Sequence, residues 1–340
     1  MFKLLSRYSE RWVQLRIQMI ADLAPHMESL RGCLPALRRL WVHWDHEDSS
    51  KAVDAIECFD TAPSLVDVGL DNISDFCTRE YLLFPVEQLT CYRVCAPWSI
   101  HQEVLELAPN IVEASISWLN LPMRALLDKV QDLPRLRRLY VSNLKFLKYL
   151  RAPVLSEIAM ILKDREDIEV FDAFVERSAC ALRRLCLNGL PDCELSAGIL
   201  NAHRSITSLA LITHSWPDPD YETLDSYLIL LRAAAVHPQL EEIHLGVMTR
   251  SSVAPIDYAL VLEMMQSRRD VLQSVAVFAA HVGCADSFHS SPGPVVQAKL
   301  DVFTKESGVE LWMGSGPEIR ERIHSWTYMT PTELDTLLEA

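Results

Sequence analysis

The fold is decided by a short phrase whose clearest copy runs Leu37-Arg38-Arg39-Leu40-Trp41-Val42. It consists of an apolar anchor, two variable residues, an apolar residue, one variable residue and a last apolar residue. The alternation over its second half is typical of a strand with one buried face. Working outward from this copy, the phrase recurs along the chain with anchors at Trp12, Leu37, Leu65, Leu89, Ile111, Leu136, Leu155, Leu182, Ile206, Leu240, Leu272 and Gly308.

The spacing of these anchors predicts a repeat protein. Successive anchors lie between 19 and 36 residues apart, and the three longest intervals all follow Ile206. Leucine-rich repeats have periods of about 20 to 29 residues, so most intervals fit and the C-terminal third is expected to carry insertions. The predicted fold class is therefore α/β, a leucine-rich-repeat-like solenoid with a concave parallel sheet and outer helices. Its strands should centre near residues 41, 69, 140, 186 and 244.

Prolines punctuate the repeats at a constant position. Because proline ends a helix and restricts the residue before it, each one predicts that a helix has ended before the next strand begins. Between phrases, Ile168, Phe171 and Val175 have helical spacing, and Ser99 with Gln102 predicts a capping box at the start of another helix. The prolines that stand two residues before an anchor are Pro35, Pro63, Pro109, Pro134, Pro153 and Pro238.

We expect the chain to form one array instead of separate globular domains. The array would run over residues 1–340 as about 11 to 12 irregular repeats. Residues 1–35 are expected to form an N-terminal cap, and about 314–340 a C-terminal cap. The alternative architecture is an α-solenoid of paired helices, which suits short phrases behind prolines less well than strands do.

Composition limits the partners. The chain has 340 residues and a formal net charge of −14, so a polyanion such as DNA or RNA is repelled on average. Its nine cysteines include no CxxC pair, the N-terminus lacks the apolar core of a signal peptide, and no apolar run is long enough to cross a membrane. These features predict free thiols in the cytoplasm or nucleus, with neither nucleic acid nor membrane as a partner.

No pattern in the sequence predicts catalysis or a cofactor. GxGxxG, the Walker loop, HExxH and the nucleophile-elbow frame do not occur, and we predict no catalytic, cofactor-binding or metal-binding residue. The most site-like cluster is His43-Trp44-Asp45-His46-Glu47-Asp48, whose two histidines and three carboxylates could hold a metal. We prefer to interpret it as a polar loop with acids at a helix N-terminus, because no second cluster completes a ligand shell.

A binding surface is easier to predict. In each phrase, the residues flanking and between the two later apolar positions alternate with buried ones and should point to the open side of the sheet. Arginine, tryptophan and tyrosine are favoured at binding hot spots. An ordinary solvated sheet surface is the competing interpretation. The candidate concave binding face comprises Arg39, Trp41, His43, Arg93, Arg138, Tyr140, Arg184 and His244.

Four segments together resemble a known family. Their order, within about residues 4 to 330, is similar to that of mushroom-type (basidiomycete) F-box proteins, which carry an N-terminal F-box before divergent leucine-rich repeats. The resemblance implies an F-box that docks on a Skp-type adaptor of a cullin–RING ubiquitin ligase, and repeats that present the substrate. The segments are Ser9-Glu10-Arg11-Trp12, Phe59-Asp60-Thr61-Ala62-Pro63-Ser64-Leu65, Gln88-Leu89-Thr90 after Pro85, and Leu147-x-x-Leu150-Arg151-Ala152-Pro153-Val154-Leu155.

The resemblance covers the repeat region and not the F-box itself. An F-box is longer than the eight residues before Ser9, and Phe84-Pro85-Val86-Glu87-Gln88-Leu89 looks like an F-box opening but falls in repeat register. We therefore expect tight binding of a Skp-type adaptor only if an F-box lies upstream. The predicted function is a protein–protein interaction module, the substrate-recognition region of an F-box-type ligase receptor, with an unknown protein target. The alternatives are an enzyme with an unrecognised active site and a repeat scaffold unrelated to ubiquitination.

Overall fold

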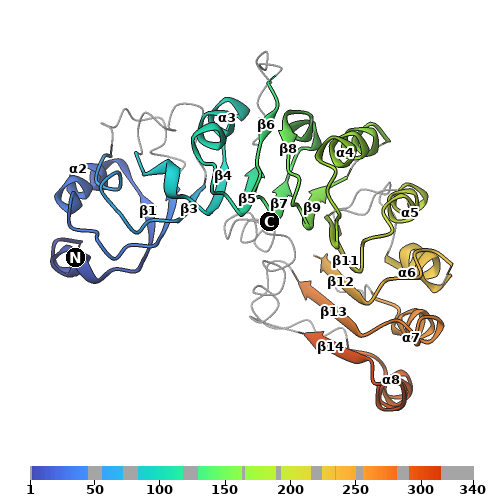
Figure 1. Cartoon of the computed structure of the whole chain (residues 1–340). Coiled ribbons are helices and arrows are strands. Elements are labelled where there is room, and N and C mark those ends of the chain that lie inside the picture. The colour runs from blue at the N-terminus through green and yellow to red at the C-terminus, as the bar shows by residue number, and fades with distance from the viewer. Residues whose placement is uncertain are drawn as a thin grey trace. The chain divides into compact units, whose positions relative to one another are not determined.

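The computed structural model describes residues 2–44, 56–71, 83–117, 129–162, 165–188, 193–215, 224–233, 235–249, 256–281 and 291–314. These residues form helices and a main sheet of 12 strands, which is not closed into a barrel (Figure 1). The chain divides into two compact units, Met1–Leu155 (unit 1) and Ser156–Ala340 (unit 2). The predicted α/β class with a parallel sheet is confirmed, and the single array over 1–340 stays a prediction.

Unit 1 contributes six strands to the main sheet, and they pair in parallel with their neighbours. In order they are β1 (Gln14–Met19), β2 (Arg39–Trp44), β3 (Asp67–Asp71), β4 (Cys91–Cys95), β5 (Glu113–Ser117) and β7 (Arg138–Val141). Two short strands, β6 (Gln131–Asp132) and β8 (Leu150–Arg151), form a separate parallel ladder. The α-helices are α1 (Phe2–Leu5), α2 (Ala24–Met27) and α3 (Trp98–Leu107), and 3-10 helices occupy Ser6–Arg11, Ala21–Leu23, Glu28–Leu30, Val86–Gln88 and Leu144–Tyr149.

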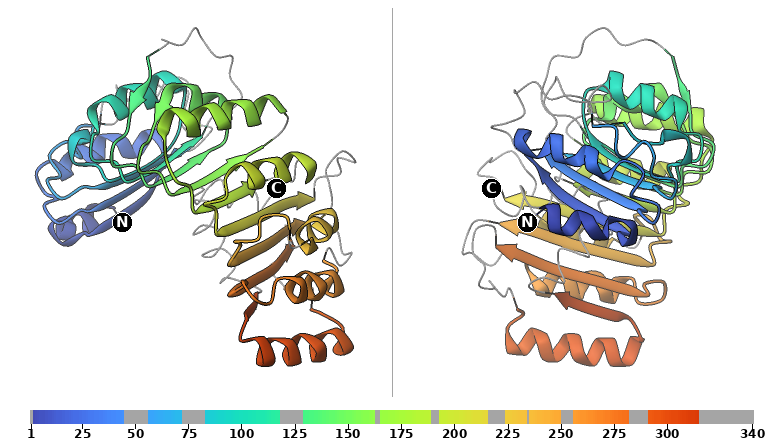
Figure 2. Two further views of the ribbon diagram at one scale, coloured as in Figure 1. Left: turned by 45° about the vertical axis from the view of Figure 1, so that its right-hand side comes forward. Right: turned by 90° about the vertical axis from the view of Figure 1, so that its left-hand side faces the viewer.

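Unit 2 alternates strand and helix more regularly. Its strands are β9 (Glu157–Ile161), β10 (Arg184–Asn188), β11 (Ser208–Ser215), β12 (Glu242–Thr249), β13 (Ser274–His281) and β14 (Glu310–Gly314). The intervening helices are α4 (Arg165–Ser178), α5 (Cys193–Ala202), α6 (Leu224–Arg232), α7 (Tyr258–Ser267) and α8 (Pro294–Ser307). Figure 2 shows α6, α7 and α8 along one side of the strands they connect. The predicted strand centres at 41, 69, 140, 186 and 244 all fall inside strands.

Each of the six prolines opens a turn that leads directly into a strand. The backbone N–H of the anchor donates to the carbonyl of the residue before the proline, as Leu37 does to Leu34 at 3.3 Å and Leu240 to His237 at 3.4 Å. Proline suits the second position of such a turn because its ring already holds φ near the required value. The predicted order of helix, proline and strand is confirmed at Pro109 and Pro238, which follow α3 and α6, but Pro134 and Pro153 directly follow the short strands β6 and β8.

The same backbone contact joins one repeat to the next in both units. In unit 1 the carbonyl of Arg38 accepts from the N–H groups of Val66 and Asp67, at 3.0 and 3.1 Å. In unit 2 the carbonyl of Thr207 accepts from Glu241 and Glu242, at 2.8 and 3.1 Å. Because each carbonyl binds the start of the following strand, this contact helps to hold neighbouring phrases in register.

Two expectations about helices have different outcomes. The apolar spacing of Ile168, Phe171 and Val175 falls within α4, so this helix is confirmed. The capping box at Ser99 is wrong, because α3 begins at Trp98 with Pro97 as its N-cap and without a side-chain cap. Pro97 has an extended conformation that starts the helix one residue early and leaves Ser99 inside the first turn.

Three further expectations can be compared with the described part of the chain. Its seven cysteines, Cys33, Cys58, Cys91, Cys95, Cys180, Cys186 and Cys193, are free thiols. None of its helices is both long enough and apolar enough to cross a bilayer. The expected C-terminal cap and the acidic part of the cluster after Trp44 lie outside the described residues.

Candidate binding surface

One side chain shows which face of the sheet carries the predicted surface. The hydroxyl of Tyr92 on β4 lies 2.9 Å from Nδ1 of His101 on α3, and both residues are fully buried. Tyr92 therefore faces the helix layer. Because successive side chains of a strand point to opposite faces, Cys91 and Arg93 point away from α3.

The strand register aligns side chains on this opposite face of unit 1 into two rows. The first row takes the residue before the second apolar position of each phrase: Gln14, Arg39, Asp67, Cys91, Glu113 and Arg138. The second row takes the residue between the two later apolar positions: Arg16, Trp41, Gly69, Arg93, Ser115 and Tyr140. Four arginines thus share the two rows with two carboxylates.

Unit 2 has the same two rows with different residues. Its first row is Glu157, Arg184, Ser208, Glu242, Ser274 and Glu310. Its second row is Ala159, Cys186, Ala210, His244, Ala276 and Trp312. One arginine and one histidine share these rows with three carboxylates, so the balance of charge is the reverse of that in unit 1.

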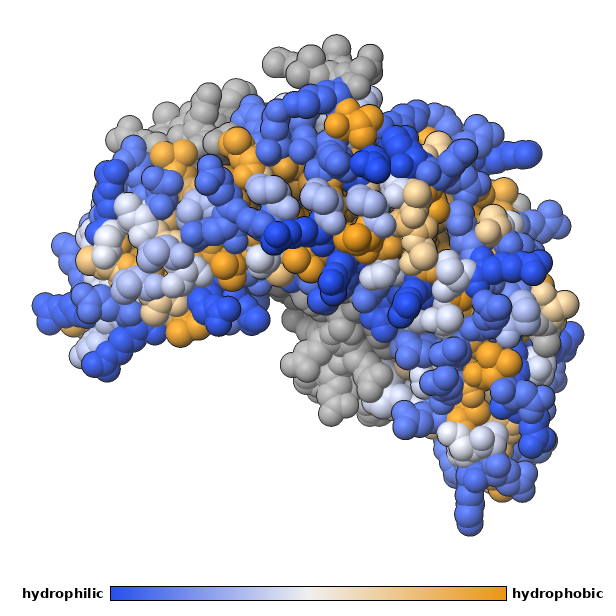
Figure 3. Space-filling model, viewed as in Figure 1, coloured by the Kyte–Doolittle hydropathy of each residue, from blue (hydrophilic) through white to orange (hydrophobic). Residues whose placement is uncertain are grey.

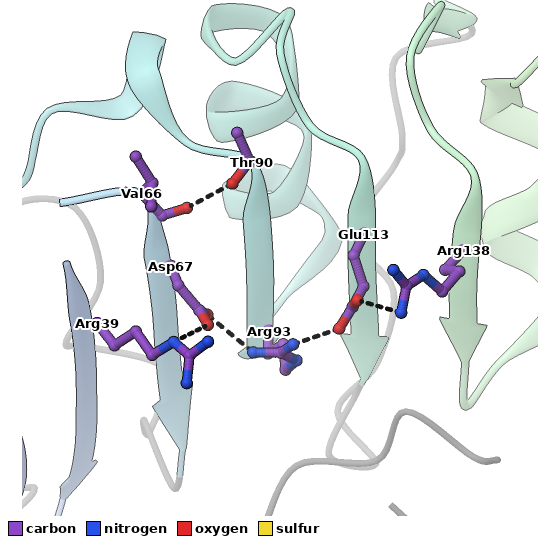
Figure 4. A network of polar contacts seen from close by, with 7 residues as sticks. All are labelled: Arg39, Val66, Asp67, Thr90, Arg93, Glu113 and Arg138. Carbon is purple, nitrogen blue, oxygen red and sulfur yellow. Dashed lines mark hydrogen bonds and ion pairs between the residues drawn. The ribbon is translucent and has the colours of Figure 1, made fainter. Parts of the chain in front are cut away.

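Arg93 lies at the centre of the ion-pair network of unit 1 (Figure 4). Its Nη1 donates to Asp67 Oδ1 at 2.8 Å, and its Nη2 donates to Glu113 Oε1. The short side chain of Cys91 stands between the two carboxylates in the first row. Arg93 thereby spans from β3 to β5 and bridges two carboxylates that are separated in sequence by 46 residues (67 to 113).

Burial makes this network costly to break. The Arg93 side chain is 12% exposed and that of Glu113 is 9% exposed. Burial by itself would lower the pKa of Arg93, but the carboxylates of Asp67 and Glu113 raise it above its usual value. A buried charge that loses its partner is strongly destabilising, commonly by about 3 to 5 kcal/mol, so the three residues act as one structural unit.

Arg39 and Arg138 occupy the two ends of the network and are much more exposed. Nε of Arg39 lies 3.7 Å from Asp67, and its side chain is 66% exposed. Nη1 of Arg138 lies 3.2 Å from Glu113, with a side chain 44% exposed. Figure 3 shows hydrophilic and hydrophobic residues interspersed over the face in view. The ends of the network can therefore meet a partner, while its centre holds the strands together.

The prediction of an exposed aromatic stripe is wrong for three of its members. Tyr140 is 1% exposed, Trp41 9%, and His244 is also buried. The reason at Trp41 is its neighbour Gly69: a Cβ built there would lie 2.1 Å from the indole ring, so the ring lies flat over a position without a side chain. Rings on the second row pack down onto the sheet instead of projecting into solvent.

The same row carries polar atoms that are buried without a partner. They are the indole Nε1 of Trp41, Nε of Arg93 and the hydroxyl of Ser115. Each lacks a hydrogen bond to any part of the chain that the structure describes. A buried donor left without a hydrogen bond costs about 1 to 3 kcal/mol. A hydrogen bond to any of these atoms would remove that cost.

Two of the remaining predicted residues, Arg184 and His244, lie near Glu242 in unit 2. The Arg184 guanidinium lies 3.6 Å from Glu157 and 3.7 Å from Glu242, and Nε2 of His244 lies 3.7 Å from Glu242. The pKa of the Glu242 carboxyl is lowered to about 2. The largest cause is the nearby His244. Burial raises the pKa, and Ser208 and Arg184 lower it further. These longer contacts form a looser network than that around Arg93. His43, on β2, is half-buried.

Sequence reasoning missed the carboxylates that connect the predicted arginines. Asp67, Glu113 and Glu242 occupy the same position of the phrase as Arg39, Arg138 and Arg184. The available signal was the alternation of opposite charges at one phrase position from copy to copy, which predicts cross-strand pairs in a parallel sheet. Selecting only arginines and aromatic residues concealed it.

A catalytic constellation is not evident among the described residues. His101 is fully buried between Tyr92 and the carbonyl of Ser117, and burial lowers its pKa to about 4. Near Glu242, both Ser208 and His244 interact with the carboxyl of Glu242. No group of three or more histidine, cysteine or acidic side chains gathers within the described ranges to hold a metal.

Comparison with known proteins adds no relative. No known family model matches this chain, and no curated protein matches it in sequence. The surface is therefore interpreted from its own residues.

Proposed function

We propose that this chain is a protein–protein interaction module, built as a leucine-rich-repeat-like solenoid, that selects substrates for an F-box-type ubiquitin ligase. The observation that carries the proposal is the pair of register-aligned rows, in which exposed arginines stand beside largely buried carboxylates on neighbouring parallel strands. Repeat proteins use such surfaces to bind partners. Complementary charge across an interface supplies specificity and faster association.

The ligase role rests on the sequence resemblance to mushroom-type F-box proteins. It requires an F-box upstream of the repeats. The repeats would select the partner, and the F-box would connect it to a Skp-type adaptor. We expect this role in the cytoplasm or nucleus, where free thiols such as those of Cys58 and Cys186 persist. A repeat scaffold with the same binding surface but no link to ubiquitin is the competing function.

The proposal is tested by capture of proteins with the full chain and two charge-matched double variants. Arg39→Glu with Arg138→Glu reverses the exposed ends of the network, and Arg151→Glu with Arg269→Glu reverses two other exposed arginines. We expect the first pair to lower the recovery of specific partners by about tenfold and the second to leave it within about twofold. Quantitative mass spectrometry measures recovery, and thermal unfolding checks that both variants fold.

The ligase role needs a second measurement. The full chain fused behind an F-box is combined with a Skp-type adaptor, cullin, RING protein and ubiquitin, and a captured partner is added. Transfer of ubiquitin to that partner, abolished by Arg39→Glu with Arg138→Glu, supports substrate selection. Recovery of the partner without ubiquitin transfer indicates a scaffold. Recovery that is unchanged by Arg39→Glu with Arg138→Glu contradicts the proposed surface.

A further inference from the structure

We propose that the sheet face of unit 1 binds an acidic, extended segment of a partner protein, with a carboxylate placed between Arg39 and the indole N–H of Trp41. The inference rests on the proposed function and names the chemistry of its partner. Arg39 and Trp41 stand two residues apart on β2 and on the same face, so they lie about 6.6 Å apart along the strand. A carboxylate that pairs with the exposed Arg39 side chain would therefore lie beside the Trp41 indole.

The charges of the two rows favour an acidic partner in unit 1. Arg16, Arg39, Arg93 and Arg138 share these rows with only two carboxylates, although the chain as a whole has a net charge of −14. In unit 2 the corresponding rows hold three carboxylates and one arginine. A local excess of positive charge on an acidic protein is a surface that attracts an acidic segment and orients it.

The network also leaves Arg39 available to an outside carboxylate. Asp67, the acid nearest to Arg39, is already held by Arg93 at 2.8 Å, whereas Arg39 approaches it only to 3.7 Å. An exposed ion pair of that length contributes little to stability. Arg39 can therefore exchange this contact for a bidentate pair with a partner carboxylate at small cost.

Trp41 supplies the second and independent observation. Its Nε1 is buried without an acceptor, and 9% of the residue remains exposed. The packing of its ring over Gly69 fixes the position of the indole. A partner oxygen that accepts this N–H removes the penalty of an unsatisfied donor, about 1 to 3 kcal/mol.

The geometry of the sheet sets the length of the segment. From Arg39 on β2 to Arg138 on β7 there are four strand steps, through β3, β4 and β5. At about 4.8 Å per step this is roughly 19 Å, which an extended chain covers in about six residues. A nucleic acid is negatively charged like the acidic segment. It would extend beyond Arg39 and Arg138, however, and be repelled by the acidic remainder of the protein.

The probe is a fluorescein-labelled peptide, Asp-Ser-Ser-Asp-Ser-Ser-Asp, titrated with the full chain at low salt by fluorescence anisotropy. We expect a Kd below about 100 µM. The matched peptide with Asn in place of each Asp should bind at least about tenfold more weakly, because it retains hydrogen-bonding groups but no charge. A uridine oligonucleotide with the same number of negative charges should also bind at least about tenfold more weakly.

Two variants with a matched control locate the contact. Arg39→Glu should weaken the acidic peptide by about tenfold, and Arg269→Glu, whose side chain is 64% exposed against 66% for Arg39, should change it less than about twofold. Trp41→Phe keeps a ring over Gly69 but removes the N–H, and should weaken binding by about three- to tenfold. Thermal unfolding confirms that each variant is folded.

The outcomes separate the two proposals. Equal binding of the Asp and Asn peptides, equal effects of Arg39→Glu and Arg269→Glu, or a nucleotide that binds as tightly as the peptide would each overturn the acidic-segment inference. If protein capture still depends on Arg39 and Arg138 in that case, the proposed function stands and only its partner chemistry is wrong. If capture ignores both arginines, the proposed function fails with it.

Discussion

Unit 1 and unit 2 align their strands in the same way but place charges on them in opposite order. In unit 1 the buried Arg93 sits between Asp67 and Glu113, and exposed arginines end the network. In unit 2 Arg184 sits between Glu157 and Glu242, so carboxylates form the ends. The difference teaches that alternating charges pair with one another along a row, and that the two units leave residues of opposite charge at the ends of their networks.

The two units also differ in how they hold their most buried arginine. Arg93 is paired with carboxylates on the sheet, whereas Arg268 of unit 2 is paired with backbone carbonyls. Arg268 is almost fully buried and donates to the carbonyls of Leu231, Ala233, Val236 and His237, which follow or end α6. Arg93 connects three neighbouring strands by ion pairs, and Arg268 binds the segment after α6 by hydrogen bonds.

The largest effect is expected from Arg93→Met, compared with Arg184→Met. The first leaves two carboxylates, one of them buried, without their shared cation and should lower the free energy of unfolding by about 3 to 5 kcal/mol. The second breaks longer contacts of a more exposed side chain and should cost about 1 kcal/mol or less. Urea unfolding measures both, and equal losses would show that the two networks do not differ in strength.

Arg268→Met should come next, at about 3 kcal/mol, because several buried carbonyls lose their donor together. Its neighbour Arg269 is exposed, so Arg269→Met serves as the matched control and should stay within about 0.5 kcal/mol of the native protein. Chemical unfolding compares the two variants. A loss at Arg269 as large as that at Arg268 would contradict the assigned role.

A smaller loss of stability is expected at glycines over which an aromatic ring of the neighbouring strand packs. A Cβ at Gly246 would lie 2.0 Å from the fully buried ring of Phe278, so Gly246→Ala should destabilise unit 2 by about 1 to 3 kcal/mol. Gly69→Ala should cost less, because Trp41 is 9% exposed whereas Phe278 is fully buried. The double variant Gly246→Ala with Phe278→Leu should recover part of the loss, and additive effects in that double-mutant cycle would rule out the contact.

The smallest effect concerns acid stability and Glu242. Its pKa is about 2 in the folded protein against 4.5 as its ordinary value, so the ionised carboxyl favours the folded state. This contribution is present above pH 4.5 and is lost as the pH falls toward 2. Because the side chain is partly exposed, the gap between the native protein and Glu242→Gln should stay below about 1 kcal/mol and close over that window. Unfolding curves from pH 6 to 2.5 measure the gap, and a constant gap would contradict the assignment.

The predicted binding face stays a prediction, but the structure shows where its residues lie and how far they are exposed. All eight predicted residues lie on strands of the main sheet, and Arg39, Arg93 and Arg138 belong to one network. The expected exposure of Trp41 and Tyr140 was wrong, because an alternating pattern identifies a face but not whether neighbours cover it.

The sequence by itself determined the strands, the turns before them and the alternation of faces. These features depend on residues close together in the chain, such as Pro35 and Leu37, which belong to one turn of four residues, 34–37. Only the tertiary structure decided that Asp67 and Glu113 meet Arg93, and that Trp41 covers Gly69. The parallel register brings residues from separate repeats side by side, and that register follows from how whole repeats pack on their neighbours.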